Sequence, residues 1–406
     1  MLSGGNGALV RSGGLFEPAG GPGTGIAGGA LVRLEGDRGL LEPAGGPGVR
    51  IAGGENLHGS GHTWDVTPSY SREAHVINFR SPNLYPESFT WDPSSQHFIV
   101  GSLRRPTLQS VSDAGVVDTL LSDTSLPSDS AFLGLAVDTQ HRRIVAVVHS
   151  SSSPAVASYN LRNGSRIFLT LLPDSNATAS SAGANDVAVD FSGNAYVTNS
   201  ASNLIYKVNK DGEFSVLSRS PIFSQSAVEP NTPYSSCGLN GVVYVSKGYL
   251  LVVQSNTGKM FKVNVDDGSA RTVLLNKALT AADGMAVRRD GVVVVASREK
   301  AYFIKSDSSW SEGVVFDETA LDAERFASAV TIGGDRRVYV LYGHIGEGMM
   351  GNTEREEFAI VEIESEKESK EDSVWIYVLI GLGLAYFMFW RFQMRQLVTD
   401  MNKKAA

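Results

Sequence analysis

Cysteine is almost absent from this chain of 406 residues, which contains only Cys237. A single cysteine excludes an intramolecular disulfide and a cysteine-based zinc site. Basic residues are also in the minority, because 35 lysines and arginines face 43 aspartates and glutamates, a net charge of −8. Phosphate binding needs a basic surface, so nucleic acid is not expected as a partner. The first residues lack a basic start followed by an apolar run, and we do not expect a signal peptide there.

Residues 1–61 differ in composition from the rest of the chain. A stretch rich in glycine and proline, 14–23, recurs at 39–48, and both copies continue into Ile-Ala-Gly-Gly. Glycine and proline at this density cannot bury enough apolar surface to offset the entropy of ordering the chain. We therefore expect residues 1–61 to be a disordered, low-complexity segment without a function of its own. A faulty gene assignment that replaced the native N-terminus would give the same pattern.

Residues 74–365 show a repeated all-β pattern, in which short runs of Val, Ile, Tyr, Phe and Leu alternate with Gly, Asp, Asn and Ser turns. Each repeat is an apolar strand, a tight turn and a second apolar strand, and the turns recur every 43–55 residues. Six repeats with room for four strands each predict a six-bladed β-propeller. The strand-like segments 74–79 and 358–363 are expected to complete one blade and close the ring. A β-sandwich or two small β domains is the alternative.

The segment from Val374 to Trp390 contains no charged side chain. At about 1.5 Å per residue it would span about 26 Å as a helix, near the thin limit of a hydrocarbon core. Trp375, Tyr377 and Trp390 lie at its ends, where interfacial aromatic residues are common. We therefore predict one transmembrane helix at 374–390, preceded by an acidic linker, 366–373, and followed by a basic tail, 391–406. A buried core helix is the alternative.

The charges that flank this helix predict its orientation. The N-terminal side has an excess of acids, whereas the C-terminal side carries Arg391, Arg395, Lys403 and Lys404. By the positive-inside rule the tail is cytosolic, and the propeller faces the lumen of the endomembrane system or the outside. Two N-glycosylation sequons, at Asn163 and Asn176, agree with this orientation. Because a helix this close to the C-terminus can also insert as a tail anchor, a cytosolic propeller is the alternative.

The first residues of the six repeats occupy equivalent positions, and they are Glu87, Leu133, Asn185, Asn240, Asp283 and Ser328. Each opens the innermost strand of its blade, and in a propeller these strand starts lie around one end of the central channel. Two carboxylates and two carboxamides that converge there form an all-oxygen site of the kind Ca²⁺ prefers, whereas Zn²⁺ would require His or Cys. Taken singly, each of these residues is more often a turn residue. Their shared register favours the metal site.

The residues that end the returning strands should face the same end of the channel. His149 and His344 are candidate catalytic proton shuttles, with surface histidines as the alternative. Asn199 and Gln254 are candidates for substrate binding, and Arg298 would meet an anionic substrate group or be solvated. Cys237 precedes Asn240 by three residues, but no base is tied to it by a motif, so a catalytic thiol is not expected.

The steps Pro86-Glu87, Asn185-Asp186, Asn240-Gly241 and Asp283-Gly284 resemble the metal-ligand positions of the senescence marker protein/gluconolactonase/luciferin-regenerating enzyme family. Plant membrane-anchored members, labelled calcium-dependent phosphotriesterase superfamily proteins, are the most similar. The resemblance covers about residues 74–365 and, in those plant members, the terminal helix. It implies that Glu87, Asn185, Asn240 and Asp283 hold one catalytic Ca²⁺ and that Asp283 is also the general base or nucleophile.

The same resemblance implies a Ca²⁺-dependent hydrolase that acts on a small-molecule lactone, ester or phosphotriester-like substrate at a membrane. One position departs from the family pattern. Sugar lactonases of the family carry an arginine two residues before the asparagine of the third blade, and here that position is Gly183. This departure puts an aldonolactone substrate in doubt. A non-catalytic propeller, braced by the metal and binding a ligand or a protein with its loops, is the alternative function.

Overall fold

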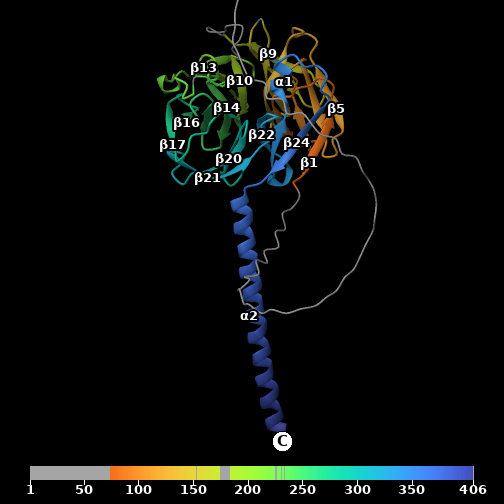
Figure 1. Ribbon diagram of the computed structural model, residues 1–406, viewed down its shortest axis with the longest axis vertical. Coiled ribbons are helices and arrows are strands. Elements are labelled where there is room, and N and C mark those ends of the chain that lie inside the picture. The colour runs from red at the N-terminus through yellow and green to blue at the C-terminus, as the bar shows by residue number, and fades with distance from the viewer. Residues whose placement is uncertain are drawn as a thin grey trace, which may run out of the picture. The chain divides into compact units, whose positions relative to one another are not determined.

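The computed structural model describes residues 74–151, 153–173, 183–224, 226–229, 231–232 and 234–405. The segment 1–61 and the sequon at Asn176 lie outside these residues, so the predictions made for them stay predictions. Within the described ranges, antiparallel β-sheets are followed by one long C-terminal helix (Figure 1).

Short runs of β-branched and aromatic residues form the strands, and Asp, Asn and Gly residues form the turns between them. β7 (Arg143–His149) and β19 (Val293–Ser297) are buried along nearly their whole length. Both faces of a strand in the middle of a sheet pack against neighbouring sheets, which explains these continuous apolar runs. The outer strand β9 (Arg166–Leu171) instead alternates between exposed and half-buried residues.

Three four-stranded sheets follow one another in the first half of the described chain, each with its strands in sequence order. The first contains β2 (Phe89–Asp92), β3 (His97–Val100), β4 (Thr107–Val111) and β5 (Val117–Ser122). The second contains β6 (Ala131–Asp138), β7, β8 (Ala155–Asn160) and β9. The third contains β10 (Ala184–Val189), β11 (Ala195–Asn199), β12 (Leu204–Val208) and β13 (Phe214–Ser218).

An eight-stranded sheet follows in the second half. One half of it contains β14 (Leu239–Val245), β15 (Tyr249–Gln254), β16 (Lys259–Asn264) and β17 (Ala270–Leu275). The other half contains β18 (Ala282–Val287), β19, β20 (Lys300–Lys305) and β21 (Glu312–Ala320). The two halves join where β17 and β21 pair in parallel, with Leu274 opposite Glu312 and Leu275 opposite Gly313.

The last sheet joins the two ends of the all-β region. Its strands are β22 (Ala327–Ile332), β23 (Val338–Tyr342), β24 (Glu357–Ile363) and β1 (Val76–Arg80). β1 pairs antiparallel with β24, and Phe79 lies opposite Phe358. This pairing confirms the predicted closure by the segments 74–79 and 358–363. The all-β, propeller-like fold is confirmed with it.

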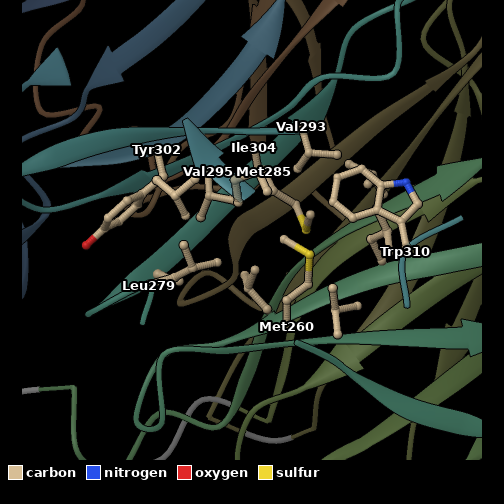
Figure 2. Close-up of a cluster of buried hydrophobic side chains, with 14 of the residues drawn as sticks. Met260, Leu279, Met285, Val293, Val295, Tyr302, Ile304 and Trp310 are labelled. Atoms are coloured by element: carbon tan, nitrogen blue, oxygen red, sulfur yellow. The ribbon is translucent and has the colours of Figure 1, made fainter. Parts of the chain in front are cut away.

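Apolar side chains pack between neighbouring sheets. Figure 2 shows one such cluster, in which Met260 of β16 lies beside Met285 of β18, with Trp310 at one side. In another cluster, Phe98 of β3 packs edge-on against Tyr339 of β23, with ring centroids 5.0 Å apart. Packing of this kind on both faces of a sheet fixes the positions of the inner strands.

The inner strands contact one another in a closed ring, in the order β2, β6, β10, β14, β18, β22 and back to β2. We call the face on which these strands begin the mouth face and the face on which they end the far face. A short helix, α1 (Ile345–Met349), follows β23 on the mouth face. Two single-turn 3-10 helices, η1 (Pro221–Phe223) and η2 (Gly334–Arg336), occur in other connections.

The C-terminal helix α2 (Glu366–Ala405) is continuous, so the acidic segment 366–373 predicted as a linker is its first part. It follows β24, which runs from the mouth face to the far face, and α2 therefore begins on the far face. There Glu368 forms an ion pair with Arg288, with 2.7 Å between Oε2 and Nη1. Residues 374–403 of α2 are long and apolar enough to cross a membrane, and none of the most apolar window is buried against the sheets.

Candidate metal centre

The inner strands approach one another closely at their first residues, on the mouth face. Gly134 of β6 lies against Asp186 of β10, and a Cβ at Gly134 would come within 2.5 Å of the Asp186 Cα. Gly241 of β14 lies against the backbone of Asp283 of β18, and a Cβ there would overlap the Asp283 carbonyl oxygen. The absence of a side chain at these two positions lets adjacent strands pack backbone to backbone. The predicted ligands are brought together as a result.

The two predicted carboxylate ligands influence each other at this end of the ring. Burial raises the pKa of Glu87 well above its usual range, and the negative charges of Asp283 and Asp186 raise it further. Burial raises the pKa of Asp283 to about 7, although the Asn240 carboxamide opposes the shift as a hydrogen-bond partner. The Asp186 charge again adds to the increase. The carboxyl groups of Glu87, just before β2, Asp186 in β10 and Asp283 in β18 therefore repel one another, which a bound cation would relieve.

The two predicted carboxamide ligands, Asn185 and Asn240, are buried beside these carboxyl groups. Asn185 Nδ2 donates to Ser200 Oγ at 3.0 Å, and Asn240 Nδ2 donates to Ser255 Oγ, also at 3.0 Å. Asn185 Oδ1 and Glu87 Oε2 are buried without a hydrogen-bond partner. Buried oxygens that the protein leaves unsatisfied are what a bound cation would coordinate.

A hard divalent cation fits this donor set. Among the described residues, no group of three or more His, Cys, Asp or Glu side chains is placed to hold a metal ion. A metal at the mouth face would therefore need the two carboxamides to complete its coordination. The four predicted ligands offer only oxygen, in the mixture of carboxylate and amide that Ca²⁺ takes in proteins. Repelling carboxyl groups and unsatisfied oxygens are the observations on which this fit rests.

Asp186 is a member of this cluster that the sequence did not single out. Its Oδ1 accepts from the N–H of Val187 at 2.8 Å, and its Oδ2 accepts from the N–H of Val242 at 3.0 Å. Burial raises the pKa of Asp186 to about 6 although both backbone hydrogen bonds lower it. The residue after the ligand position is Ser, Gly or Ala in the other five repeats. The acidic side chain at this one repeat position was the feature of the sequence that could have identified Asp186 as part of the cluster.

Cys237 also belongs to the cluster. Asn240 Nδ2 lies 3.6 Å from Cys237 Sγ. Burial raises the pKa of this thiol, and the charge of Asp283 raises it further. A raised pKa keeps the sulfur protonated.

The two predicted catalytic histidines lie at the mouth face, one at the end of β7 and the other in the loop after β23. His149 ends β7, opposite Ala131, and is half-buried. His344 is buried ahead of α1, and its Nδ1 lies 3.1 Å from Glu347 Oε1. Arg355 binds the same carboxylate through two nitrogens. His344 is thus part of a charged cluster in the loop after β23.

The three predicted substrate-binding residues have different surroundings. Gln254 is fully buried, and its Nε2 donates to Phe223 O at 2.7 Å while its Oε1 accepts from Thr257 Oγ1 at 2.7 Å. Asn199 is also buried, and its Oδ1 accepts from the N–H of Ser202. Both side chains support loops. The contacts of Gln254 give no support to substrate binding, whereas Asn199 Nδ2 is buried without a hydrogen-bond partner. Arg298 is exposed after β19 and remains accessible to a ligand.

A cavity of about 370 Å³ continues from the ligand positions along the inner strands. Its lining is formed by residues that follow the ligand positions, among them Val137, Val189, Val287, Thr331 and Asp186. Most of the residues that line this part of the channel have apolar side chains. Polar chemistry is concentrated at the mouth face.

Comparisons with known proteins agree with this architecture. The sequence profile of the SMP-30/Gluconolactonase/LRE-like region matches residues 85–342. No curated protein matches the chain. The solved structure of the major allergen Mala s 1 of Malassezia sympodialis superposes with a TM-score of 0.59 at 18% identity, covering 71% of this chain and 96% of the allergen.

Two further solved structures are also similar. A protein assigned as a gluconolactonase superposes with a TM-score of 0.50 at 15% identity, covering 72% of this chain and 93% of its own. The gluconolactonase of Xanthomonas campestris superposes with a TM-score of 0.48 at 16% identity, covering 72% and 91%. At 18% and 15% identity, the likeness to the allergen and to the first of these two structures establishes the fold alone.

Proposed function

Because the chain belongs to the SMP-30/gluconolactonase/LRE-like family, we propose that it is a Ca²⁺-dependent hydrolase of lactones, esters or phosphotriester-like compounds. One observation carries this proposal: carboxyl and carboxamide groups gather at the mouth face, where the carboxyl groups repel one another and two buried oxygens are unsatisfied. The proposed ligands of the ion are Glu87, Asn185, Asn240 and Asp283.

We assign six blades to the propeller. The closed ring of six inner strands supports this number. The eight-stranded sheet then counts as two blades, which divide at the parallel pairing of β17 with β21. This pairing involves only two residues of each strand and joins the outer edges of two antiparallel units. It is a local contact between neighbouring blades.

Bound Ca²⁺ would polarise a carbonyl or phosphoryl oxygen of the substrate and stabilise negative charge that develops on it. The side chains would supply the remaining chemistry. Asp283 would be ionised beside a cation and would remove a proton from the attacking water or attack the substrate itself. His149 and His344 would transfer protons at the rim, and Arg298 would hold an anionic substrate group. Asn199 and Gln254 would act through the loops that they support.

The substrate class is broader than sugar lactones in this proposal. Gly183 occupies the position at which the sugar lactonases of the family carry an arginine, so this chain offers no cation there to hold a polyhydroxylated ring. Simple lactones, aryl esters and phosphotriesters are the compounds to compare.

The proposal is tested by assaying the full chain against such a panel, with Ca²⁺ and after chelation with EGTA. We expect Ca²⁺-dependent turnover, and Asp283→Asn should lower kcat by about 10²–10⁴-fold because it removes a carboxylate base at nearly constant volume. Asp267→Asn is the matched control, since Asp267 is exposed in the turn between β16 and β17. Full turnover by Asp283→Asn, or in excess EGTA, would contradict the proposal.

A metal-braced binding module is the second candidate. The commitment of Gln254 to loop support favours it, because a residue expected to hold a substrate serves the scaffold. A binding module should hydrolyse no compound in the panel. Its Tm, measured by thermal unfolding, should nevertheless be higher with Ca²⁺ than with EGTA.

We also propose that Val374–Trp390 anchors the chain in a membrane, as the length and composition of α2 allow. Because α2 begins on the far face, the mouth face and the candidate metal centre would open away from the bilayer. We favour a propeller in the endomembrane lumen or outside the cell, with a cytosolic tail anchor as the alternative. Resemblance to plant membrane-anchored members stays a prediction.

A further inference from the structure

The two carboxamides of the candidate centre share one kind of support. Asn185 is hydrogen-bonded to Ser200, which follows directly after β11, and Asn240 to Ser255, which follows directly after β15. Each serine thus comes from the strand next to the one that carries its asparagine. The same hydrogen-bond arrangement therefore occurs twice, in adjacent sheets.

The hydroxyl protons of these serines are already committed. Ser200 Oγ donates to Leu239 O at 2.6 Å, and Ser255 Oγ donates to Ala282 O at 2.6 Å. A hydroxyl has one proton, so each Oγ can only accept from the carboxamide. The NH₂ group of each asparagine must therefore face its serine, which directs Oδ1 to the other side. Asn185 shows the result, since its Oδ1 is buried without a partner.

The carbonyl groups that receive these protons lie next to other predicted ligands. Leu239 directly precedes Asn240, and Ala282 directly precedes Asp283. Ser200 therefore connects Asn185 with the backbone at Asn240, and Ser255 connects Asn240 with the backbone at Asp283. Two hydroxyl groups thus link three predicted ligands, which lie on three successive inner strands, through hydrogen bonds.

We propose that Ser200 and Ser255 are positioning residues of the metal centre, which orient the two carboxamides so that Oδ1 faces the cation. The inference deepens the proposed function and rests on it. Without its serine, a carboxamide loses the hydroxyl acceptor that favours this orientation and can turn Nδ2 towards the cation, where its partial positive charge is repelled. Asn240 Nδ2 keeps Cys237 Sγ at 3.6 Å and Asp283 as further partners, so the effect should be larger at Asn185. Outer partners of metal ligands typically change metal affinity by about 10–100-fold when they are removed.

The test measures Ca²⁺ affinity of the full chain by isothermal titration calorimetry, without reference to turnover. Ser200→Ala and Ser255→Ala should each weaken Ca²⁺ binding by about 10–100-fold, and Ser200→Thr, which keeps the hydroxyl, should restore most of it. Ser102→Ala is the matched control. Its buried Oγ donates to Leu84 O at 3.1 Å in the same way but supports no carboxamide, so Ca²⁺ affinity should stay within about threefold.

A double substitution separates orientation from general stability. Asn185→Asp replaces the carboxamide with a carboxylate, whose two oxygens are equivalent, so its orientation no longer matters. In the Asn185→Asp background, adding Ser200→Ala should change Ca²⁺ affinity by less than about threefold, in contrast to its effect in the parent chain. Equal losses in both backgrounds would overturn the inference.

The remaining outcomes are also decisive. If the parent chain binds Ca²⁺ but both single alanine variants bind it equally well, the positioning role is wrong and the proposed function stands. If the parent chain binds no Ca²⁺, the proposed function fails, and the inference with it. If Ser200→Ala does not fold, as judged by near-UV circular dichroism, Ser255→Ala gives the same test at the second carboxamide.

Discussion

Glu87, Asp186 and Asp283 show what the ring of inner strands imposes on single side chains. Burial raises the pKa of all three, to about 6 for Asp186 and to about 7 for Asp283. Carboxyl groups that repel one another in a buried place destabilise the fold that holds them. A bound divalent cation would make the electrostatic environment of each carboxylate favourable, because each would then face a positive charge. In the function we propose, a bound cation accounts for these residues.

His344 provides a pH test away from the predicted ligands. Burial lowers the pKa of His344, the positive charge of Arg355 lowers it further, and Glu347 opposes the shift. The unfolded chain then takes up a proton more readily than the folded chain. This contribution to stability is fully present above the unfolded pKa of about 6.5 and is lost as the pH falls through it towards the lower folded value. We expect the Tm to fall between pH 7.5 and pH 5.5.

The matched variant for this prediction is His344→Asn. Asparagine tolerates the left-handed backbone at this position, where φ is 51°, and it does not titrate. Differential scanning calorimetry of both chains should show a smaller decrease in Tm for the variant over the same pH range. Parallel decreases would mean that other groups account for the pH dependence.

The sequence could predict the residues at the mouth face only where the repeat defines their register. Glu87, Asn185, Asn240 and Asp283 could be found because each lies within two residues of the start of an inner strand. Ser200 was missed because its role depends on the bulge that shifts the pairing of β10 with β11 between Ala184 and Val187. A residue that pairs across such an irregularity has no fixed spacing in the sequence.

At the scale of elements, glycines determine how closely the inner strands approach. Alone, Asn240-Gly241 and Asp283-Gly284 are typical of turns. In the structure both glycines lie inside strands, β14 and β18. A Cβ at Gly284 would come within 2.8 Å of the Ala329 Cα in β22. The glycine after each of these ligands therefore lets the next inner strand approach.

Gly241→Ala tests this role. The added Cβ would overlap the carbonyl oxygen of Asp283, so the backbone of β14 or β18 must shift. We expect a loss of stability of about 1–3 kcal/mol, as for other overpacked sites, together with weaker Ca²⁺ binding because Asp283 moves. Urea unfolding and calorimetric titration would measure the two effects.

Gly346→Ala is the control for the glycine substitution. Gly346 lies in α1, and its nearest neighbour to an added Cβ is Phe326 Cδ2 at 3.9 Å, an ordinary contact. Stability and Ca²⁺ affinity should change little. If Gly241→Ala also leaves stability and Ca²⁺ affinity nearly unchanged, the close approach of β14 and β18 does not explain why a glycine occupies position 241.

Strands were more predictable than their assembly into sheets. Each repeat contains two apolar runs joined by a turn, and these became the two innermost strands of each unit, for example β10 and β11. The parallel contact between β17 and β21 could not be predicted, because it depends on the loop that carries Trp310 against the cluster in Figure 2. Local patterns specify a strand, whereas the pairing of edges depends on packing between distant residues.

At the scale of the whole molecule, α2 begins on the far face, whereas the candidate metal centre lies on the mouth face. Ser365 Oγ donates to Asp317 at 2.7 Å and accepts from the N–H of Glu368, so the helix is capped at its first turn against β21. The ion pair between Glu368 and Arg288 adds a second contact on the far face. Anchoring through α2 would therefore leave the mouth face free for soluble or membrane-derived substrates.

The anchoring prediction concerns the middle of the apolar segment. Arginine at the centre of a membrane-spanning helix costs about 2.5–3.5 kcal/mol of insertion free energy. Leu379→Arg combined with Leu382→Arg should therefore release the chain from membranes during alkaline carbonate extraction, whereas the parent chain stays in the pellet. Gln393→Arg, which adds a cation just beyond Trp390, should stay in the pellet as well. Release of the parent chain would show that α2 does not span the bilayer.

The side of the membrane follows from Asn163, if anchoring holds. Asn163 is exposed in the turn between β8 and β9, where its Oδ1 accepts from the N–H of Ser165. A lumenal propeller would be accessible to the glycosylation machinery, so glycosidase treatment of the parent chain should increase its mobility in a denaturing gel. Asn163→Gln should remove that part of the change.

An anchored chain that shows no change on treatment, with a C-terminus protected from protease outside the vesicles, would instead establish a cytosolic propeller on a tail anchor. The net positive charge after Trp390 favours the first result, because it places the tail in the cytosol.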